Sequence, residues 1–428
     1  MGASESGDCW VETERVDDVV QIMISIDEAL QWVMSHTQPP AAVEVPLTDS
    51  CGLVLDEDVA SDIDSPPHDK SLVDGYALRS EDLTAPTAVL RVIEEVTAGA
   101  VPGRTVISGT ATRIMTGAPI PLGADAVVKV EDTTSVDSSS VCIETSGVLA
   151  GTHILSQAAS LRRGDLILRR GTWIRPIEIG ILAEIGRALV AVRPRPQVAV
   201  VATGNELVPV GEVPQPGQIR NSNAPMLSAM AEACGAIASD LGICADDTSL
   251  LRQTIERGLE RDVLVLSCGV SAGVLDLVPK VLRDCGVQET FHKVNLKPGK
   301  PLWFGVLPQS EGSDKLVFGL PGNRVSSLVC FHLFVRPAIG VLAGEHPNLV
   351  TPGPICRAKL SLEYSHRSDR PTYAPARATE RDEELWVEPL QWHGSADLAT
   401  LARANCLLVL PGKEAKYPTG SLVEILQL

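Results

Sequence analysis

The spacing of apolar residues changes several times along the chain, and each change predicts a different kind of structure. Residues 1–17 are polar and acidic without an apolar period, so a solvated tail is expected there. Ser25 and Glu28 then have the spacing of a capping box, which marks the start of a helix. The apolar face of this helix is Ile26, Ala29, Leu30, Val33 and Met34, and Pro39-Pro40 end it.

Residues 41–192 carry short runs of β-branched residues that Gly and Pro interrupt, which predicts a β-rich and loop-rich region. The clearest strand candidates are 88–92, 126–130 and 165–168. One helix is expected after Pro176, where four apolar residues recur at helical spacing. These residues are Ile177, Ile181, Leu182 and Ile185.

Strands and helices alternate over residues 194–343. Apolar strands are expected at 198–202, 237–243, 263–267 and 316–318. Asn223 and Asp247 have the positions of helix N-caps, and further helices are expected at 277–285 and 325–339. This alternation predicts a parallel sheet with helices on both faces, in which ligands bind beyond the carboxyl ends of the strands. Residues 346–428 return to short strands with Pro and Gly turns, which predicts a second small β unit.

Composition narrows the class of protein. The 428 residues are 44% hydrophobic and 21% charged, which is ordinary for a globular chain with a large core. Lysine and arginine number 36 against 54 aspartates and glutamates, a net charge of -18, so neither general nucleic-acid binding nor attachment to an anionic membrane is expected. No apolar run approaches the ~18 residues of a membrane span. Ten cysteines without a Cys-x-x-Cys pair predict a reduced, cytoplasmic protein.

Loops rich in Gly, Ser and Asn follow three of the expected strands. Small residues let backbone N–H groups approach an anion, and a helix that follows adds its dipole. The loop at 267–276, which contains Ser271 and Gly273, has no Gly-Lys-Ser/Thr and so is not a P-loop. A tight strand-to-helix connection without a ligand is the alternative interpretation of this loop.

The acidic chain contains one basic stretch. Three of its ten lysines, Lys293, Lys297 and Lys300, fall within eight residues that contain no Asp or Glu. Pro298 and Pro301 fix this turn and hence the direction of the ammonium groups. The stretch is the local basic pocket that an anionic ligand requires in such a chain, and an exposed basic turn is the alternative.

Three acids, Glu206, Asp246 and Asp276, lie at or just past predicted strand ends. Carboxylates beside lysines at one sheet edge suit Mg²⁺ or the placement of a polyanion. Taken singly, each acid fits a solvated side chain or a helix cap better than a metal ligand, and Asp276 has the position of a cap for the helix at 277–285. In the β-rich part, Asp74-Gly75 has the pattern of a hairpin turn.

In their order along the chain, these stretches resemble the motifs of the molybdopterin molybdenumtransferases, the MoeA family, which includes the E domain of gephyrin. The resemblance covers the chain from about residue 20 to residue 428 and is far more specific than any single motif. The matching motifs are Ser71-x-x-Asp74-Gly75-Tyr76-Ala77, Thr116-Gly117-Ala118-Pro119, Thr203-Gly204-x-Glu206-Leu207, Gly217-Gln218-Ile219 with Asn223, Gly269-Val270-Ser271-x-Gly273, Lys297-Pro298-Gly299-Lys300-Pro301, Gly319-Leu320-Pro321-Gly322-Asn323, Gly394-Ser395-x-Asp397 and Ala404-Asn405.

The resemblance implies an elongated, multidomain α/β plus β protein that forms a homodimer. Its expected parts are a flexible tail (1–17), a three-layer α/β domain like those of MoaB and Mog (18–37 and 194–345), a small β-rich linker domain (38–60 and 157–193), an inserted β-rich arm (61–156) and a small C-terminal β-barrel-like domain (346–428). In this family the arm of one protomer completes the active site on the α/β domain of the other.

The resemblance also implies a reaction, in which molybdate is joined to the dithiolene of adenylyl-molybdopterin, AMP is released, and Mg²⁺ is the usual metal. The implied catalytic residues are Asp74, Glu206 and Asp276, and the implied metal ligands are Glu206, Asp246 and Asp276. The implied substrate-binding residues are Thr116, Asp246, Ser271, Gly273, Lys293, Lys297, Pro298, Lys300, Pro301, Arg370 and Ser395. A separate MoaB/Mog-type protein is expected to perform the adenylylation.

The chain departs from the family pattern at several positions. Ala158-Ala159-Ser160 stands where an acid is usual, Cys268 replaces the first Gly of a Gly-Gly-Val-Ser loop, and Arg324 replaces a usual Pro. Two alternatives therefore stay open. One is a pterin-binding or scaffolding paralogue with weak or no insertase activity, and the other is an α/β ligase-type enzyme that uses another nucleotide.

Overall fold

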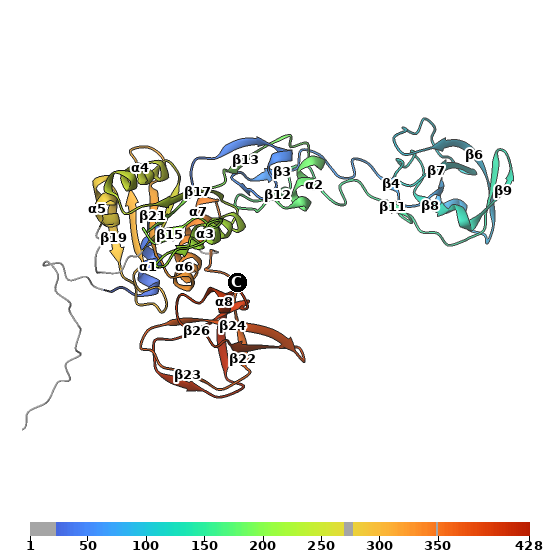
Figure 1. Ribbon diagram of the computed structural model, residues 1–428. Coiled ribbons are helices and arrows are strands. Elements are labelled where there is room, and N and C mark those ends of the chain that lie inside the picture. Colours follow the sequence, from blue (N-terminus) through green and yellow to red (C-terminus); the bar gives the residue numbers. More distant parts are fainter. Residues whose placement is uncertain (1–22, 269–276, 348–349) are drawn as a thin grey trace, which may run out of the picture. The chain divides into compact units, whose positions relative to one another are not determined.

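The structure is a computed structural model that describes residues 23–268, 277–347 and 350–428 (Figure 1). The chain forms two compact units. The larger unit takes the residues up to 45, 52–56 and 191–428, and the smaller unit takes 46–51 and 57–190. The domain boundaries expected from the sequence are finer than this division and stay a prediction.

A six-stranded sheet forms the centre of the larger unit. Its strand order is β17-β14-β18-β21-β20-β19, and the first four strands run parallel, as predicted. The expectation of a wholly parallel sheet is wrong at one edge, because β20 runs antiparallel to both β21 and β19. Only the loop 293–302, here called the lysine loop, joins β19 to β20, and a parallel pair would need a longer crossover. The strands are β14 (Gln197–Thr203), β17 (Ile237–Cys244), β18 (Val263–Cys268), β19 (Gln288–His292), β20 (Trp303–Leu307) and β21 (Lys315–Pro321).

Helices cover both faces of this sheet, as the alternation of elements predicts (Figure 1). Val198 and Val200 of β14 pack into one core, whereas Ala199 and Val201 pack into the other, because successive side chains of a strand point to opposite faces. The first core is completed by α1, α3, α6 and α7, and the second by α4 and α5. The helices are α1 (Ile26–Ser35), α3 (Asn223–Ala233), α4 (Thr248–Leu259), α5 (Leu277–Asp284), α6 (Arg324–Cys330) and α7 (Arg336–Leu342).

Helix α1 begins where the sequence predicts. The Glu28 N–H donates to the Ser25 hydroxyl at 3.2 Å, and the Ser25 N–H donates to the Glu28 carboxylate at 2.8 Å, so the capping box is formed. Ala29 and Val33 are fully buried and belong to the first core. The N-terminal helix is thereby part of the same packed layer as α6 and α7.

Of two predicted helix caps, one is confirmed and one is wrong. Asp247 caps α4 by accepting two backbone N–H groups at 2.9 Å. Asn223 is the first residue of α3, and the N-cap position belongs to Ser222. The Asn221 side chain supplies the bond at this helix start, because it accepts from the Ala224 N–H at 3.1 Å. The Asn223 amide is used elsewhere, at the ends of the strands.

The π-helical turn η4 (Phe331–Val335) joins α6 to α7 in one 19-residue helix, Arg324–Leu342. An 18-residue window of this helix has a mean hydropathy of 1.7, so by length and composition the helix could span a membrane. The expectation that no apolar run has this size is therefore wrong. However, 89% of the same window is buried inside the protein. A helix that is apolar on all sides is typical of the centre of a large core, and this helix belongs to the first core.

Five strands of the C-terminal part close into a barrel in the order β22-β25-β24-β26-β28, which confirms the small β unit expected there. Its interior contains Leu360, Ala376 and Leu408, all fully buried. The elements are β22 (Ile355–Leu360), β23 (Tyr364–His366), β24 (Thr372–Arg381), β25 (Glu384–Pro389), α8 (Leu398–Leu401), β26 (Cys406–Leu410), β27 (Ala415–Tyr417) and β28 (Leu422–Gln427).

The smaller unit is β-rich, as predicted, and strands occur at all three expected places. Its arm is a six-stranded sheet in the order β8-β5-β7-β6-β10-β9. Helix α2 (Pro176–Glu184) follows Pro176, although Ile177 is 74% exposed and only Leu182 of the predicted apolar face is fully buried in it. The arm strands are β5 (Gly75–Leu78), β6 (Ala88–Val96), β7 (Thr110–Ile114), β8 (Ala126–Lys129), β9 (Thr133–Asp137) and β10 (Ser140–Ile143). The short strands are β1 (Val43–Pro46), β2 (Val54–Leu55), β3 (Val59–Ala60), β4 (Lys70–Ser71), β11 (Ile154–Leu155), β12 (Leu166–Leu168) and β13 (Leu189–Arg193).

Candidate functional site

A pocket of about 270 Å³ opens at the carboxyl edge of the α/β sheet. The ends of β14, β18 and β21 contribute Thr203, Ser267 and Pro321 to its lining, at the edge where the sequence pattern predicts a ligand. The short parallel strands β15 (Leu207–Val208) and β16 (Ile219–Arg220) and the start of α3 form another part of the lining. The remaining lining residues are Glu206, Asn221, Ser222, Asn223, Pro301, Gly322, Asn323 and Arg324.

Asn223 ties two of these strand ends together. Its Nδ2 atom donates to the Ser267 hydroxyl and to the Gly322 carbonyl, both at 2.7 Å. The side chain is only 8% exposed, and its Oδ1 atom has no hydrogen-bond partner among the residues that the structure describes. Buried polar atoms are satisfied in most proteins, so the lining contains an acceptor that is suited to a ligand donor or to water.

Asn223→Ala is expected to lower the free energy of unfolding by about 2–4 kcal/mol, because it leaves a buried hydroxyl and a carbonyl without their shared donor. Denaturant unfolding measures this loss. Asn323→Ala is the matched control, since Asn323 is exposed and caps α6 without a side-chain hydrogen bond. The control should shift stability by no more than about 0.5 kcal/mol, and equal losses in both variants would contradict the role given to Asn223.

The loop after β14 places Glu206 at the pocket. Gly204 has a φ of +144°, and a Cβ atom there would overlap the Glu206 carboxylate, so only glycine lets this side chain fold back. The Asp246 N–H donates to the Asn205 side-chain oxygen at 3.1 Å, which joins the loop after β17 to the loop after β14. The structure therefore brings the Glu206 and Asp246 loops together, with Glu206 exposed and Asp246 half-buried.

The lysine loop lies at the same edge of the sheet. Because β19 and β21 both run antiparallel to β20, they are parallel to each other, and the loop after β19 starts where β21 ends. Pro301 lines the pocket, and the Val294 N–H donates to the Lys300 carbonyl at 2.9 Å to close the turn. Lys300 is exposed, whereas Lys293 and Lys297 are half-buried.

Residues of the barrel domain form hydrogen bonds with the lysine loop. The Lys297 N–H donates to the Pro371 carbonyl and the Tyr373 N–H donates to the Lys297 carbonyl, both at 2.8 Å. The Arg370 guanidinium donates to the Leu296 carbonyl at 3.4 Å. Lys297 and Arg370, which the family resemblance assigns to substrate binding from distant parts of the chain, therefore lie on adjoining segments.

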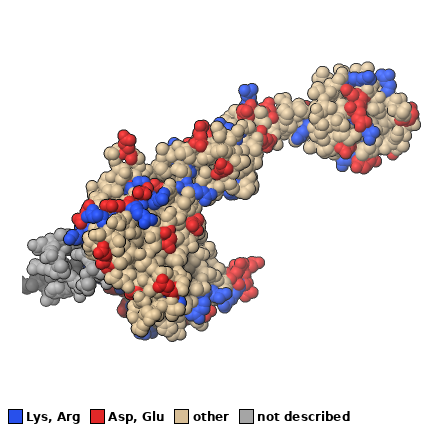
Figure 2. Space-filling view, turned by 45° about the horizontal axis from the view of Figure 1, so that its top comes forward, with Lys and Arg blue, Asp and Glu red and all other residues tan. Residues whose placement is uncertain are grey.

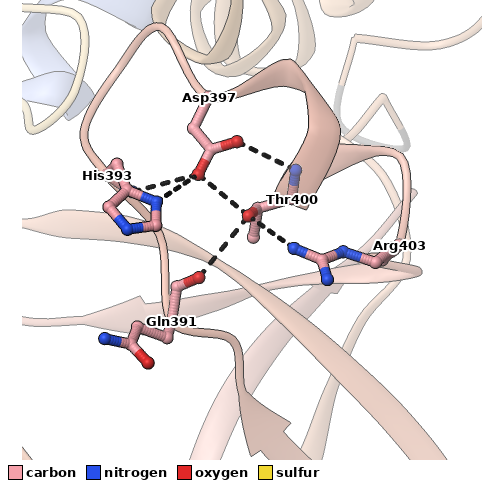
Figure 3. A network of polar contacts seen from close by, with 5 residues as sticks. All are labelled: Gln391, His393, Asp397, Thr400 and Arg403. Atoms are coloured by element: carbon pink, nitrogen blue, oxygen red, sulfur yellow. Dashed lines mark hydrogen bonds and ion pairs between the residues drawn. The ribbon is translucent and has the colours of Figure 1, made fainter.

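A hydrogen-bond network shapes the loop that carries Ser395 (Figure 3). The Asp397 carboxylate accepts from the Thr400 N–H at 3.0 Å and hydroxyl at 2.9 Å, and from the His393 N–H at 3.0 Å. These donors, the Thr400 N–H first, hold the pKa of Asp397 far below its ordinary value. The Ser395 carbonyl accepts from the Val325 N–H at 2.9 Å, so the loop contacts the first turn of the helix that starts at the pocket.

Asp74 and Thr116 lie together in the arm. Both the N–H and the hydroxyl of Thr116 donate to the same Asp74 oxygen at 2.7 Å. These bonds hold the pKa of Asp74 below its ordinary value, so the exposed carboxylate is ionised at neutral pH. The two residues belong to the smaller unit and the pocket belongs to the larger, so a site that combines them remains a prediction.

The side chains of Glu206 and Asp246 have the oxygen ligands that Mg²⁺ prefers. Among the residues that the structure describes, no group of three or more His, Cys, Asp or Glu side chains can hold a metal by itself. The hard oxygens of Glu206 and Asp246 suit Mg²⁺, which proteins often hold through one or two carboxylates, waters and substrate phosphates.

Of the other predicted site residues, Pro298 is buried, and Ser271, Gly273 and Asp276 lie outside the described residues.

Part of the lining is missed by the sequence interpretation, which assigns no role to Arg220, Asn221 or Ser222. The polar run 220–223 between two apolar segments is the pattern that points to them. Acidic and basic side chains are interspersed over the described part of the face in Figure 2.

Three segments of the chain match known protein families. Residues 24–186 match the MoeA N-terminal region (domain I and II), and residues 199–340 match a family described as a probable molybdopterin binding domain. Residues 357–428 match the MoeA C-terminal region (domain IV).

Curated proteins and solved structures resemble the chain over most of its length. The molybdopterin molybdenumtransferase of Staphylococcus aureus (strain Mu50) is 33% identical over 408 residues, which is 94% of this chain and 95% of that protein. The Staphylococcus epidermidis enzyme of the same name is 31% identical over 411 residues, with 94% and 95% covered. A crystal structure of the molybdopterin biosynthesis MoeA protein from Pyrococcus horikosii has a TM-score of 0.80 at 30% identity and covers 95% of this chain and 99% of that chain.

Proposed function

The chain belongs to the MoeA family of molybdopterin molybdenumtransferases, and on that premise we propose that it inserts molybdenum into molybdopterin during synthesis of the molybdenum cofactor. The observation that carries the proposal is the pocket at the carboxyl edge of β14, β18 and β21, within the segment that matches the probable molybdopterin binding domain. Parallel α/β sheets bind their ligands at this edge.

The charges at this edge suit the reaction. Molybdate, the pterin phosphate and an adenylate are all anions, and they must be brought together by a protein with a net charge of -18. Lys293, Lys297 and Lys300 belong to the lysine loop, whose Pro301 lines the pocket, and Arg370 contacts this loop from the barrel domain. Lysine and arginine side chains bind such oxyanions through charge-assisted hydrogen bonds.

We take adenylyl-molybdopterin as the substrate. The two dithiolene thiols bond to molybdenum while one molybdate oxygen leaves as water with their two protons, and hydrolysis of the phosphoanhydride releases AMP. Glu206, Asp246 and Asp276 would hold Mg²⁺, which would supply positive charge to the phosphates. The protein's own groups place the two anions side by side and stabilise the charge that develops as the phosphoanhydride breaks.

The proposed assembly is a homodimer in which the arm of one protomer brings Asp74 and Thr116 to the pocket of the other. Their exposure in the arm, and the fixed, ionised state of Asp74, support this use. A separate MoaB/Mog-type enzyme supplies the adenylylated substrate in this proposal. The proposed compartment is the cytoplasm, because a dithiol substrate must stay reduced.

The activity is tested with purified protein, adenylyl-molybdopterin, Mg²⁺ and molybdate, with AMP release as the readout. AMP release is expected to depend on both molybdate and Mg²⁺. Tight pterin binding without molybdate-dependent AMP release would contradict the proposal. A parallel reaction with tungstate reports which oxyanion the enzyme prefers.

A further inference from the structure

Two arginines of the pocket have no place in the reaction described so far. Arg220 ends β16, Arg324 begins α6, and both line the pocket. Neither guanidinium forms an ion pair with a carboxylate among the residues that the structure describes. Two unpaired cations in the lining of one cavity, in a chain with a net charge of -18, point to an anionic ligand.

Both guanidiniums are anchored through the same atom. The Arg220 Nε donates to the Glu212 carbonyl at 2.8 Å, and the Arg324 Nε donates to the Ser222 hydroxyl at 3.0 Å. A bond at Nε fixes the plane of the group and leaves the Nη1 and Nη2 atoms for a ligand. This pair of donors matches two oxygens of one phosphate.

A bound anion would stabilise Arg324 at its position in the helix. Arg324 is the first residue of α6, where the positive end of the helix dipole disfavours a cation. A bound phosphate would offset both positive charges. Independently, the buried Asn223 Oδ1 atom in the same lining has no hydrogen-bond partner among the described residues. This acceptor suits an N–H donor of a bound pterin rather than its phosphate, so it points to a ligand in the same pocket whose anionic group is left to the arginines.

We propose that Arg220 and Arg324 form a phosphate clamp, in which Arg324 sets the preference for a phosphorylated pterin. The inference rests on the proposed function, because the clamped group is the phosphate or pyrophosphate of the pterin substrate. Molybdate then belongs to the lysine loop and Arg370, so the two anions occupy separate cation groups around one pocket. Each of the two cation groups therefore has its own ligand, whose affinity can be measured separately.

The test is a calorimetric titration of the full-length protein with inorganic pyrophosphate and, separately, with molybdate. Arg324→Gln and Arg220→Gln are each expected to weaken pyrophosphate binding by about tenfold or more. Arg324→Pro should behave in the same way, and it keeps α6 intact because proline is favoured at the first position of a helix. Arg257→Gln, an equal charge change at an exposed position of α4, is the control and should stay within about twofold.

The outcomes separate this inference from the proposed function. Unchanged pyrophosphate affinity in Arg324→Gln and Arg324→Pro would overturn the clamp even if the protein releases AMP. A loss of molybdate affinity in place of pyrophosphate affinity would overturn it too. Pyrophosphate binding that depends on Arg324, in a protein without molybdate-dependent AMP release, would support the clamp and contradict the insertase.

Discussion

Lys297→Ala is expected to weaken molybdate binding by about 10- to 100-fold and to lower turnover by at least as much, without unfolding the protein. The Lys297 backbone is held by two hydrogen bonds at 2.8 Å to Pro371 and Tyr373, so the path of the lysine loop does not depend on the ammonium group. The side chain is half-buried on a segment that adjoins Arg370, where reduced access to water strengthens its attraction for an oxyanion.

Calorimetric titration with molybdate and AMP release measure the two losses. Lys280→Ala is the matched control, because it removes one lysine charge from an exposed position of α5 in the same domain. The control should keep its molybdate affinity. Unchanged affinity in Lys297→Ala, or an equal loss in both variants, would show that the lysine loop is not the molybdate site.

Asp74→Asn is expected to lower turnover by about 100-fold or more while pyrophosphate and molybdate binding change little. The carboxylate is ionised at neutral pH because two Thr116 donors hold its pKa down, whereas an asparagine is neutral and offers an N–H in place of one oxygen. A group that acts in the reaction should lower kcat, and a group that only holds the arm should lower stability.

Asp137→Asn is the control for the arm, because the Asp137 carboxylate also accepts from a neighbouring N–H and hydroxyl, those of Ser139. Both aspartates are exposed in the arm, so the two substitutions should affect stability equally. A difference in turnover between the two variants then reports a role of Asp74 in the reaction. Full activity in Asp74→Asn, or an equal loss in both variants, would remove Asp74 from the active site.

The sequence predicts features that depend on neighbouring residues better than features that depend on distant ones. The capping box at Ser25 and the cap at Asp247 need only residues two or three positions away, and both are present. Asn223 fails as a predicted cap because its amide is drawn to Ser267 and Gly322, which are brought near only when β18 and β21 pair.

In the candidate site too, residues in local motifs are predicted, whereas residues that distant pairing brings to the pocket are missed. Glu206 and Pro301 line the pocket as the motifs suggest, since strand ends and small-residue loops are visible in the sequence. The antiparallel direction of β20 is not visible, because it follows from sheet pairing rather than from apolar spacing. Arg220 and Ser222 are missed because the pairing of β15 with β16 and the start of α3 bring them to the pocket.

The central claim is that a pocket of one protomer works with the arm of another, and purified heterodimers test it most directly. Asp74→Asn and Lys297→Ala chains with different tags are coexpressed, and the mixed dimers are isolated. Each mixed dimer contains one site with both residues intact, so about half of the normal AMP release per dimer is expected. A dimer of one normal chain with one chain that carries both substitutions should be inactive. The reverse pattern, activity in the second dimer and none in the first, would contradict the shared site.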